Sequence, residues 1–452
     1  MKNPKDTICA ISTAPGIGGI AVIRVSGTDA FLAVDAIFSG DVFSQSPMTL
    51  AFGNIISEDK LIDEVLVSKF KGPHSFTGED VMEISCHGSI YVQQEILRLL
   101  LEKGCRVAEH GEFTKRAFLN RKMDLSQAEA VADLIASETA AEHRLAITQL
   151  KGGFSKELSS LRQKLMDFAS LMELELDFSE EDVEFADRGE FKRLIQDILY
   201  RVNALIVSFK WGNTIKTGIP VAIIGPPNSG KSTLLNYILK EERAIVSEIA
   251  GTTRDVIEDR ITIDGQSIRF IDTAGLRSTE DEIERKGITL ALQKAALARV
   301  IIFLYDPWSE DPESIESKLE TFEIVRKEER EVLIVANKCD LHSETRIPET
   351  HLLISAKEGT GVDRLLKNIS AIATIQLEQR GNHIVTNLRH YELLQQVSQS
   401  LGMVRLGLDE NLSTDLLSIE LKRALFALGE ITGEVTTDDL LGNIFSRFCI
   451  GK

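Results

Sequence analysis

Long apolar runs are absent from this sequence of 452 residues. A membrane-spanning helix needs about 20 consecutive apolar residues, and no uninterrupted run approaches that length. Residues 1–6 lead straight into a short strand-like segment at 7–13, without the apolar stretch and small-residue cleavage site of a secretory signal. These absences predict a cytoplasmic protein without a membrane segment.

Cysteine is scarce, and its five residues are odd in number and widely scattered. No two of them have the spacing of metal ligands, and an odd number does not suit a disulfide framework. We therefore expect free thiols in a reducing compartment. The five are Cys9, Cys86, Cys105, Cys339 and Cys449.

Positive charge is in deficit, since 51 Lys and Arg residues face 69 Asp and Glu residues and the formal net charge is −18. A protein that binds nucleic acid mainly through phosphates normally presents a basic surface, because its affinity comes from counterion release. The composition therefore disfavours an autonomous RNA-binding protein. It leaves open an RNA substrate that is held locally, or together with a partner that supplies positive charge.

The overall composition is that of a globular protein, with 43% hydrophobic and 27% charged residues. The length predicts two or three domains. Within residues 1–120, apolar β-rich runs are separated by Gly, Pro and Asp, and a helix-like run follows at 91–101, which indicates an α+β domain. The β-rich runs lie at 20–25, 62–70 and 81–85.

Helical spacing of apolar residues begins near residue 124, where Ser126 and Glu129 have the spacing of a capping box, and continues with interruptions to about 209. Strand–loop–helix alternation lasts from 218 to about 375, and the pattern is helical again from 390. Since the amphipathic stretches on both sides need an apolar partner, we expect them to pack on each other. The predicted architecture is multidomain, with an α+β domain at 1–120, a discontinuous α-helical domain at 121–217 and 378–452, and an inserted α/β P-loop domain at 218–377.

The segment 225–232 carries a phosphate-loop motif, Gly-Pro-Pro-Asn-Ser-Gly-Lys-Ser. It fits G-x-x-x-x-G-K-[ST] and lies between a strand-like run at 221–224 and a helix-like run at 234–239, which is the context that the motif requires. In such a loop, backbone N–H groups face the phosphates, Lys231 reaches the β and γ oxygens, and the Ser232 hydroxyl ligates Mg²⁺.

Three further motifs follow in order, each directly after a strand-like run, where a doubly wound sheet makes its ligand contacts. An acid such as Asp272 suits a contact to Mg²⁺ through water, and the N–H of Gly275 can sense a γ-phosphate. The Asp340 carboxylate can accept two hydrogen bonds from the N1–H and amine of guanine, a pair that adenine does not offer. The motifs predict a guanine-nucleotide domain, and they are Asp272-Thr273-Ala274-Gly275, Asn337-Lys338-Cys339-Asp340 and Ser355-Ala356-Lys357.

Leu276 stands where Ras-type proteins carry the glutamine that positions the attacking water. A leucine side chain neither donates nor accepts a hydrogen bond, so either hydrolysis is slow or another residue supplies this function. Most of the charged residues nearby are also compatible with a solvated switch loop. The candidates are Arg277, Glu280, Asp281, Glu282 and Glu284.

Asn228 is the second unusual residue, because its amide oxygen can coordinate a monovalent cation beside the phosphates. Added positive charge there would stabilise the transition state as an arginine finger does. The alternative is an ordinary loop residue. Between the loop and Asp272, the polar and Gly-containing stretch 245–255 suits a mobile switch, and one of its threonines is expected to ligate Mg²⁺.

These residues resemble the potassium-dependent TrmE–Era GTPases, through Asn228, the switch 251–255, Leu276 and Glu284. Within that class the flanking segments resemble the MnmE (TrmE) family of tRNA-modifying GTPases over the full length. The matching runs are 18–27, 75–83, 110–113, 116–120 and the ending Phe448-Cys449-Ile450-Gly451-Lys452.

The resemblance implies that the first domain binds folate and dimerises, and that the inserted domain is a G domain. It implies a tetrahydrofolate derivative, 5-formyl- or methylene-tetrahydrofolate, held by Arg24, Glu83, Lys122 and Lys452. It implies K⁺ held by Asn228, Ser247, Ile249 and Thr252, Mg²⁺ held by Ser232 and Thr253, and Glu284 as the catalytic acid acting through water. Motifs and resemblance together give the expected GTP contacts Asn228, Ser229, Gly230, Lys231, Ser232, Thr233, Ser247, Glu248, Ile249, Ala250, Gly251, Thr252, Thr253, Asp272, Thr273, Ala274, Gly275, Asn337, Lys338, Asp340, Ser355, Ala356 and Lys357.

The resemblance also implies a homodimer, potassium-stimulated pairing of G domains, and a flavin-dependent partner, MnmG (GidA). The pair would install a carboxymethylaminomethyl or aminomethyl group on the wobble uridine of certain tRNAs. Two alternatives are a regulatory or ribosome-assembly GTPase without substrate chemistry, and a folate-dependent methyltransferase. The first normally has a basic RNA-binding module, which this acidic chain lacks, and the second leaves the GTPase motifs unexplained. Cys449 is open to a redox or catalytic role and to that of a buried or site-lining thiol.

Overall fold

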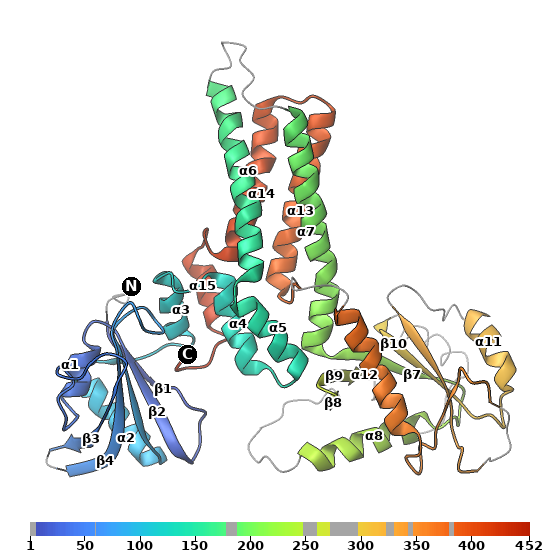
Figure 1. Ribbon diagram of the computed structural model, residues 1–452, viewed down its shortest axis with the longest axis horizontal. Helices are drawn as coiled ribbons and strands as arrows, with labels where there is room; N and C mark the ends of the chain where they lie inside the picture. Colours follow the sequence, from blue (N-terminus) through green and yellow to red (C-terminus); the bar gives the residue numbers. More distant parts are fainter. Residues whose placement is uncertain are drawn as a thin grey trace. The chain divides into compact units, whose positions relative to one another are not determined.

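The computed structural model describes residues 6–58, 60–177, 188–246, 260–271, 297–321, 330–341, 347–378 and 384–452. The chain divides into two compact units, each of which is described by itself. Figure 1 labels helices and strands of both units. Unit 1 comprises Met1–Ala136, Ile147–Arg188 and Gly407–Lys452. Unit 2 comprises Ser137–Ala146 and Gly189–Leu406.

Unit 1 contains a sheet with the strand order β3-β4-β5-β2-β1-β6, in which neighbours are antiparallel except for the parallel pair β1–β6. The β-rich runs predicted from the sequence form β2, β4 and β5, which confirms the α+β prediction for this region. The strands are β1 (Ile8–Ile11), β2 (Gly18–Ser26), β3 (Leu50–Ser57), β4 (Lys60–Phe70), β5 (Val81–Gly88) and β6 (Arg106–Val107).

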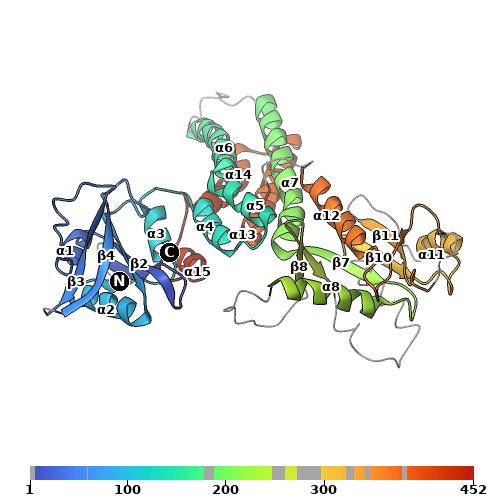
Figure 2. The ribbon, with the colours of Figure 1, turned by 60° about the horizontal axis from the view of Figure 1, so that its bottom comes forward.

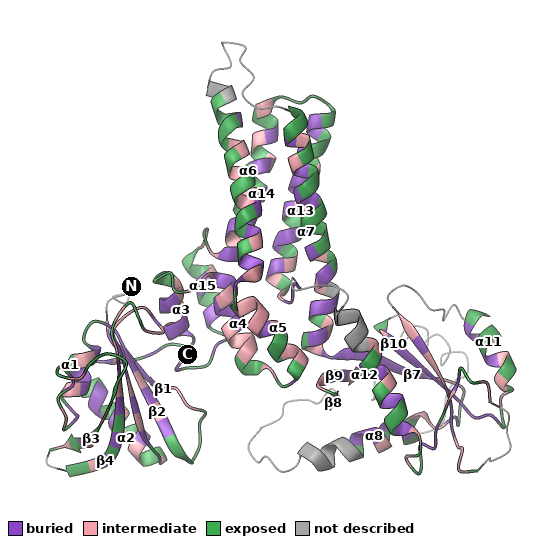
Figure 3. Ribbon diagram, viewed as in Figure 1, coloured by how far each residue is buried: buried purple, intermediate pink, exposed green. Residues whose placement is uncertain are grey.

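One face of this sheet packs against helices α1 (Ala30–Asp35) and α2 (Ile90–Glu102). Alternate residues of the strands point to that face, so that Val65 and Val67 are buried in one core with Ile96 and Leu100 of α2. The opposite face carries exposed apolar side chains on β3 and β4, and Figure 3 shows these two strands partly in the colour of exposed residues.

The helices of unit 1 come from both sides of the nucleotide motifs in the sequence. Helix α6 (Gly153–Asp177) packs along α14 (Thr414–Thr432), which confirms the prediction that the flanking helical stretches pack on each other. The other helices are α3 (Glu112–Leu119), α4 (Leu125–Ala136) and α15 (Asp438–Phe445), and α5 (Ala140–Leu150) crosses the boundary between the units.

The capping box at the start of α4 differs from the predicted pair Ser126 and Glu129. Asp124 Oδ1 accepts a hydrogen bond from Gln127 N at 2.9 Å, and Gln127 Oε1 accepts one from Asp124 N at 3.0 Å. The reciprocal pattern is therefore shifted by two residues, and the prediction was wrong. Ser126 instead donates to Asp124 and shares a bond with Ser155 of α6, so its side chain is used in helix packing.

The C-terminal segment returns to the first sheet of unit 1. His110 and Ile450 form an antiparallel bridge, and Gly111 N donates to Cys449 O at 3.3 Å. Gly451 has a positive φ of 95°, and a Cβ added there would lie 2.3 Å from the Ile11 carbonyl oxygen. Only glycine therefore allows the chain end to lie this close to β1.

Unit 2 contains a second sheet with the strand order β12-β11-β10-β7-β9-β8 (Figures 1 and 2). All neighbours are parallel except β8–β9, as expected for a P-loop α/β domain. Its strands are β7 (Ile219–Ile224), β8 (Arg260–Ile263), β9 (Gln266–Phe270), β10 (Val300–Tyr305), β11 (Glu331–Ala336) and β12 (Leu352–Leu353).

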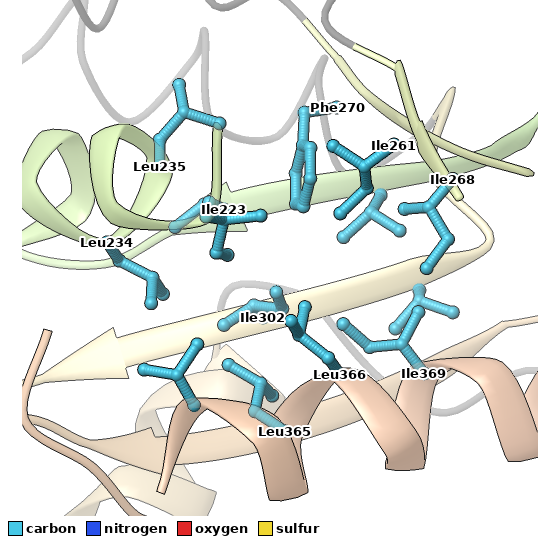
Figure 4. Close-up of a cluster of buried hydrophobic side chains, with 14 of the residues drawn as sticks. Ile223, Leu234, Leu235, Ile261, Ile268, Phe270, Ile302, Leu365, Leu366 and Ile369 are labelled. Carbon is cyan, nitrogen blue, oxygen red and sulfur yellow. The ribbon is translucent and has the colours of Figure 1, made fainter. Parts of the chain in front are cut away.

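Both faces of this sheet are covered, so its central strands are continuously apolar. Every residue of β7 and β10 is buried. Figure 4 shows one of the two cores, in which Ile223 and Ile302 of the strands meet Leu235 of α8 and Leu365 of α12. The helices of this sheet are α8 (Lys231–Val246), α11 (Ile315–Thr321), which follows the short helix η2 (Pro312–Ser314), and α12 (Val362–Glu378).

Unit 2 also contains most of α7 (Arg188–Thr217) and most of α13 (Leu388–Asp409). The Phe209 and Tyr391 rings stack with centroids 4.3 Å apart, and Ser398 Oγ donates to Asn203 Oδ1 at 2.9 Å. Segments that precede and follow the α/β block in the sequence are therefore in contact here as well, which makes that block an insertion. Within the described residues, no helix is both long enough and apolar enough to cross a membrane.

Candidate functional site

The phosphate-loop motif forms the connection between β7 and the first turn of α8, as its sequence context predicted. Gly225 has a φ of 148°, and a Cβ at this position would lie 1.9 Å from the Leu304 carbonyl oxygen of β10. No side chain fits there, so the loop can pass close to β10 only because residue 225 is glycine.

Lys231 lies across this loop. Its Nζ donates to the carbonyl oxygens of Gly225 at 3.1 Å and Pro226 at 2.7 Å. The ammonium group is therefore held at the N-terminus of α8, where unpaired backbone N–H groups and the helix dipole already favour an anion. Ser232 and Thr233 follow in the first turn of the helix, and both are exposed.

The buried side chain of Asn337 connects the phosphate loop to the segment that follows β12. Its Nδ2 donates to Ser229 O at 2.8 Å, and its Oδ1 accepts from Ala356 N at 2.9 Å. Asn337 N also donates to Tyr305 O at 2.8 Å at the end of β10. The side-chain amide of Asn337 thus joins its own segment to Ser229, 108 residues away in the sequence, and to Ala356, 19 residues away.

Asp340 is held by the motif that follows β12. Ser355 is fully buried, and its hydroxyl donates to Asp340 Oδ1 at 2.7 Å. This bond fixes the rotamer of a carboxylate whose oxygens can accept the N1–H and amine protons of guanine. Lys357 of the same motif is exposed. The structure therefore brings together the phosphate loop and the two base motifs.

Several predicted residues lie outside the described part of the chain. They are the switch residues Ser247, Glu248, Ile249, Ala250, Gly251, Thr252 and Thr253, the motif Asp272, Thr273, Ala274 and Gly275, and Glu284. Their predicted contacts to GTP, Mg²⁺ and K⁺, and the catalytic role of Glu284, remain predictions.

Asp306 was missed by the sequence reasoning. It directly follows β10, and its Oδ2 lies 2.8 Å from Nζ of Lys338. A signal was present, because Asp306 is a polar residue directly after a strand whose six residues are all buried. The segment 300–305 belonged to the strand–loop–helix region but was not singled out as a strand.

The predicted folate residues lie in unit 1. Arg24 and Glu83 face each other across β2 and β5, and both Nε and Nη2 of Arg24 lie 2.8 Å from Glu83 Oε1. The guanidinium also lies 5.1 Å from the ring centre of Phe76 and 5.7 Å from that of Phe113. This arrangement combines a charged pair with aromatic surface.

The other two residues predicted to bind folate, Lys122 and Lys452, lie in different segments of unit 1. Lys122 Nζ donates to Pro73 O at 2.8 Å, in the loop between β4 and β5. Lys452 follows Gly451, whose carbonyl accepts a hydrogen bond from Ser12 Oγ at 3.1 Å. Ser12 directly follows β1, the strand that pairs with β2 and therefore neighbours Arg24. The structure thus brings Arg24 and Glu83 into contact and anchors the end of the chain beside their sheet.

A mostly parallel sheet with a phosphate loop after β7 and an Asn-Lys-x-Asp segment after β11 defines a P-loop domain of the GTPase class. Comparison with known families identifies the flanks as well. A family model described as GTP-binding protein TrmE N-terminus matches residues 7–122, and one described as MnmE helical domain matches residues 125–449.

Curated relatives match over nearly the whole chain. A protein of Flavobacterium johnsoniae named tRNA modification GTPase MnmE is 50% identical over 99% of this chain and 99% of its own length. Proteins of the same name from Flavobacterium psychrophilum and Bacteroides thetaiotaomicron are each 51% identical, over 99% of this chain and 99% and 100% of their own lengths. The chain belongs to the MnmE family of GTPases.

Among solved structures, one of Era in complex with MgGDPNP and nucleotides 1506–1542 of 16S ribosomal RNA is 24% identical. It covers 40% of this chain and 66% of its own, with a TM-score of 0.24. At that score the similarity supports no conclusion about this protein.

Replacement of Asp340 by Asn tests the base contact. An amide can donate to the 2-oxo group of xanthine but offers guanine a donor where an acceptor is needed. A hydrogen bond to a charged group contributes about 1.5–3 kcal/mol. Since the amide loses one of the two bonds and removes the charge from the other, GTP should bind at least about tenfold more weakly. We expect Asp340→Asn to bind xanthosine triphosphate more tightly than GTP in equilibrium titrations. The matched control is Glu358→Gln, an exposed acid in the neighbouring loop, and an unchanged base preference in Asp340→Asn would show that the guanine contact is misassigned.

Proposed function

We propose that this chain is the GTP-hydrolysing subunit of the tRNA wobble-uridine modification system. It would add a carboxymethylaminomethyl or aminomethyl group at position 5 of the uridine, together with the flavin-dependent partner MnmG. The observation that carries the proposal is the full-length similarity to proteins named tRNA modification GTPase MnmE. The link from the phosphate loop through Asn337 to the base motifs supports the nucleotide half of the function.

The acidic composition supports a shared rather than an autonomous tRNA site. A net charge of −18 gives the chain little general attraction for a polyanion. A tRNA substrate bound jointly with a partner protein is consistent with this charge. The five cysteines are free thiols, which supports location in a reducing cytoplasm.

A tetrahydrofolate derivative fits the residues around Arg24 and Glu83. A pterin is flat and carries N–H donors, so a carboxylate near aromatic rings suits it. Glu83 is paired with Arg24, whose guanidinium lies over the Phe76 ring. The ammonium groups of Lys122 and Lys452 suit the carboxylates of the glutamate tail. The chemistry that the bound folate supplies is a one-carbon unit, while the chain's own residues bind and orient it.

The phosphate loop fits the two proposed metal ions. Ser232 is exposed in the first turn of α8, where its hydroxyl would hold Mg²⁺ together with Thr253. Asn228 is exposed and has a positive φ of 59°, so the loop presents its amide oxygen at the surface for K⁺, with Ser247, Ile249 and Thr252 as the other ligands. Glu284 would act through water in place of the glutamine that Leu276 replaces.

Hydrolysis should depend on the monovalent cation. Asn228 offers a cation ligand and Leu276 leaves the water without its usual partner, so we expect GTP turnover at least about tenfold faster in potassium chloride than in sodium chloride. Asn228→Gly keeps the positive φ without the amide oxygen and should lose this difference. Steady-state phosphate release at equal ionic strength measures it, and equal turnover in the two salts would contradict the proposal.

A homodimer is supported by the uncovered face of the first sheet. Leu50, Phe52 and Leu66 are 65%, 69% and 43% exposed, and Phe52 stands directly opposite Leu66 across β3 and β4. On the other face the neighbouring residues Val65 and Val67 are buried under helices. An apolar sheet face of this kind normally packs against another layer, and a second copy of the same face would bury both.

The dimer proposal predicts that Phe52→Asp lowers self-association. Burying an apolar side chain contributes roughly 1.5–3 kcal/mol, and a two-fold interface contains two copies of it, so the dissociation constant should rise at least about hundredfold. Leu32→Asp is the control, because Leu32 is 59% exposed but lies on α1, on the other side of the sheet. Sedimentation equilibrium measures both, and a chain that is monomeric before substitution would refute the proposal.

The experiment that tests the function is mass spectrometry of tRNA nucleosides from cells with and without the gene. We expect deletion to remove the aminomethyl-type wobble uridine, and the intact gene to restore it. A Lys231→Ala copy should fail to restore it, because the loop then lacks the ammonium that reaches the phosphates. An unchanged nucleoside profile on deletion would favour the second candidate, a regulatory switch GTPase.

A further inference from the structure

Lys338 has an unusual backbone conformation. Its φ is 67°, in the left-handed region that residues with a side chain rarely adopt. The Leu341 N–H donates to the Lys338 carbonyl at 3.0 Å and closes a turn around Cys339 and Asp340, while Cys339 N donates to Ile354 O at 3.1 Å. The side chains of Lys338 and Asp340 therefore project from one tight turn at the carboxyl end of β11.

The ammonium group of Lys338 does not bond within this turn. Its Nζ lies 2.8 Å from Oδ2 of Asp306, at the end of the neighbouring strand β10. The side chain of Asp306 is only 10% exposed, whereas that of Lys338 is 31% exposed. A buried carboxylate is stable when it is paired and hydrogen-bonded, and the charge of Lys338 provides that pairing.

The carboxylate of Asp306 is also held by hydrogen bonds from the residues that follow it in the chain. Its Oδ1 accepts from Trp308 N at 3.1 Å, and its Oδ2 accepts from Ser309 Oγ at 3.4 Å. Its backbone carbonyl accepts from the N–H groups of Ser309 and Glu310 at 3.0 Å. The carboxylate is therefore held in a defined orientation by the loop that carries it.

We propose that Asp306 is a positioning residue for the nucleotide base and acts through Lys338. By holding the ammonium group, it extends the methylene chain of Lys338 as an apolar wall beside Asp340, where the flat face of the base would lie. A lysine loses much side-chain freedom when it is ordered, and Asp306 orders it before the nucleotide arrives, so less of the binding free energy is lost. This inference rests on the proposed assignment of residues 337–340 to the base.

Asp306→Asn tests the inference because it removes the charge and keeps the shape of the side chain. We expect GDP to dissociate about tenfold faster, as one charge-assisted contact is weakened. The kcat at saturating GTP should stay within about twofold while KM rises, since Lys338 is not among the residues that hold the phosphates. Glu313→Gln, an exposed acid in the helix η2 that follows this loop, is the control and should change neither GDP release nor KM.

A double-mutant cycle separates positioning from a merely structural role of Asp306. Lys338→Met keeps an unbranched apolar side chain but removes the ammonium group, and should itself speed GDP dissociation about tenfold. In the Lys338→Met background Asp306→Asn should then add less than about twofold, because the contact through which it acts is already gone. A carboxylate that only shapes its loop would instead cause the same loss in both backgrounds.

The measurement is release of a fluorescent GDP analogue from the full chain, after each variant has been shown to melt like the original without nucleotide. Lys338 is 31% exposed, so Lys338→Met can be measured even if Asp306→Asn does not fold, and unchanged GDP release in Lys338→Met would also overturn the inference. Equal effects of Asp306→Asn in both backgrounds, or no effect in either, overturn the inference and leave the GTPase assignment intact. Failure of the unaltered chain to bind the analogue overturns both.

Discussion

The nucleotide half of this protein depends on the side-chain amide of Asn337. Its two hydrogen bonds hold the phosphate loop and the Ser355–Lys357 motif at the same edge of the second sheet. Lys231 and Asp340 lie on separate segments, and these bonds fix the distance between the two. They therefore set the spacing between a contact to the phosphates and a contact to the base. A buried amide is suited to this work, because both of its ends must be satisfied and each end therefore selects one partner.

Those parts of the fold and the site that depend on strong local patterns could be predicted from the sequence. Every residue of β7 is buried, so its apolar run and the motif after it identified both the strand and the phosphate loop. The base motifs were found in the same way. The contact between α6 and α14 also followed from pattern, because amphipathic helices on both sides of an inserted block need each other.

The contacts that were missed depend on which of several chemically similar residues forms the contact in the folded chain. Asp124, Ser126, Gln127 and Glu129 all suit a helix start, and only the geometry shows that Asp124 and Gln127 form the box, since Ser126 bonds to Ser155 of a distant helix. Asp306 was missed because the strand before it was not singled out, and because its partner Lys338 is 32 residues away in the sequence. Arg24 and Glu83 were not missed, but they were named only through the family resemblance, because a pair across two strands has no periodic signal in the sequence.

The central claim is that the site selects guanine, and wild-type base selectivity tests it most directly. Equilibrium titration of the full chain with GDP and ADP compares two ligands that differ only in the base. The carboxylate of Asp340 can pair with guanine and not with adenine, so GDP should bind at least about hundredfold more tightly. Equal affinities for the two nucleotides would contradict the account, because the phosphate loop alone would then explain all of the binding.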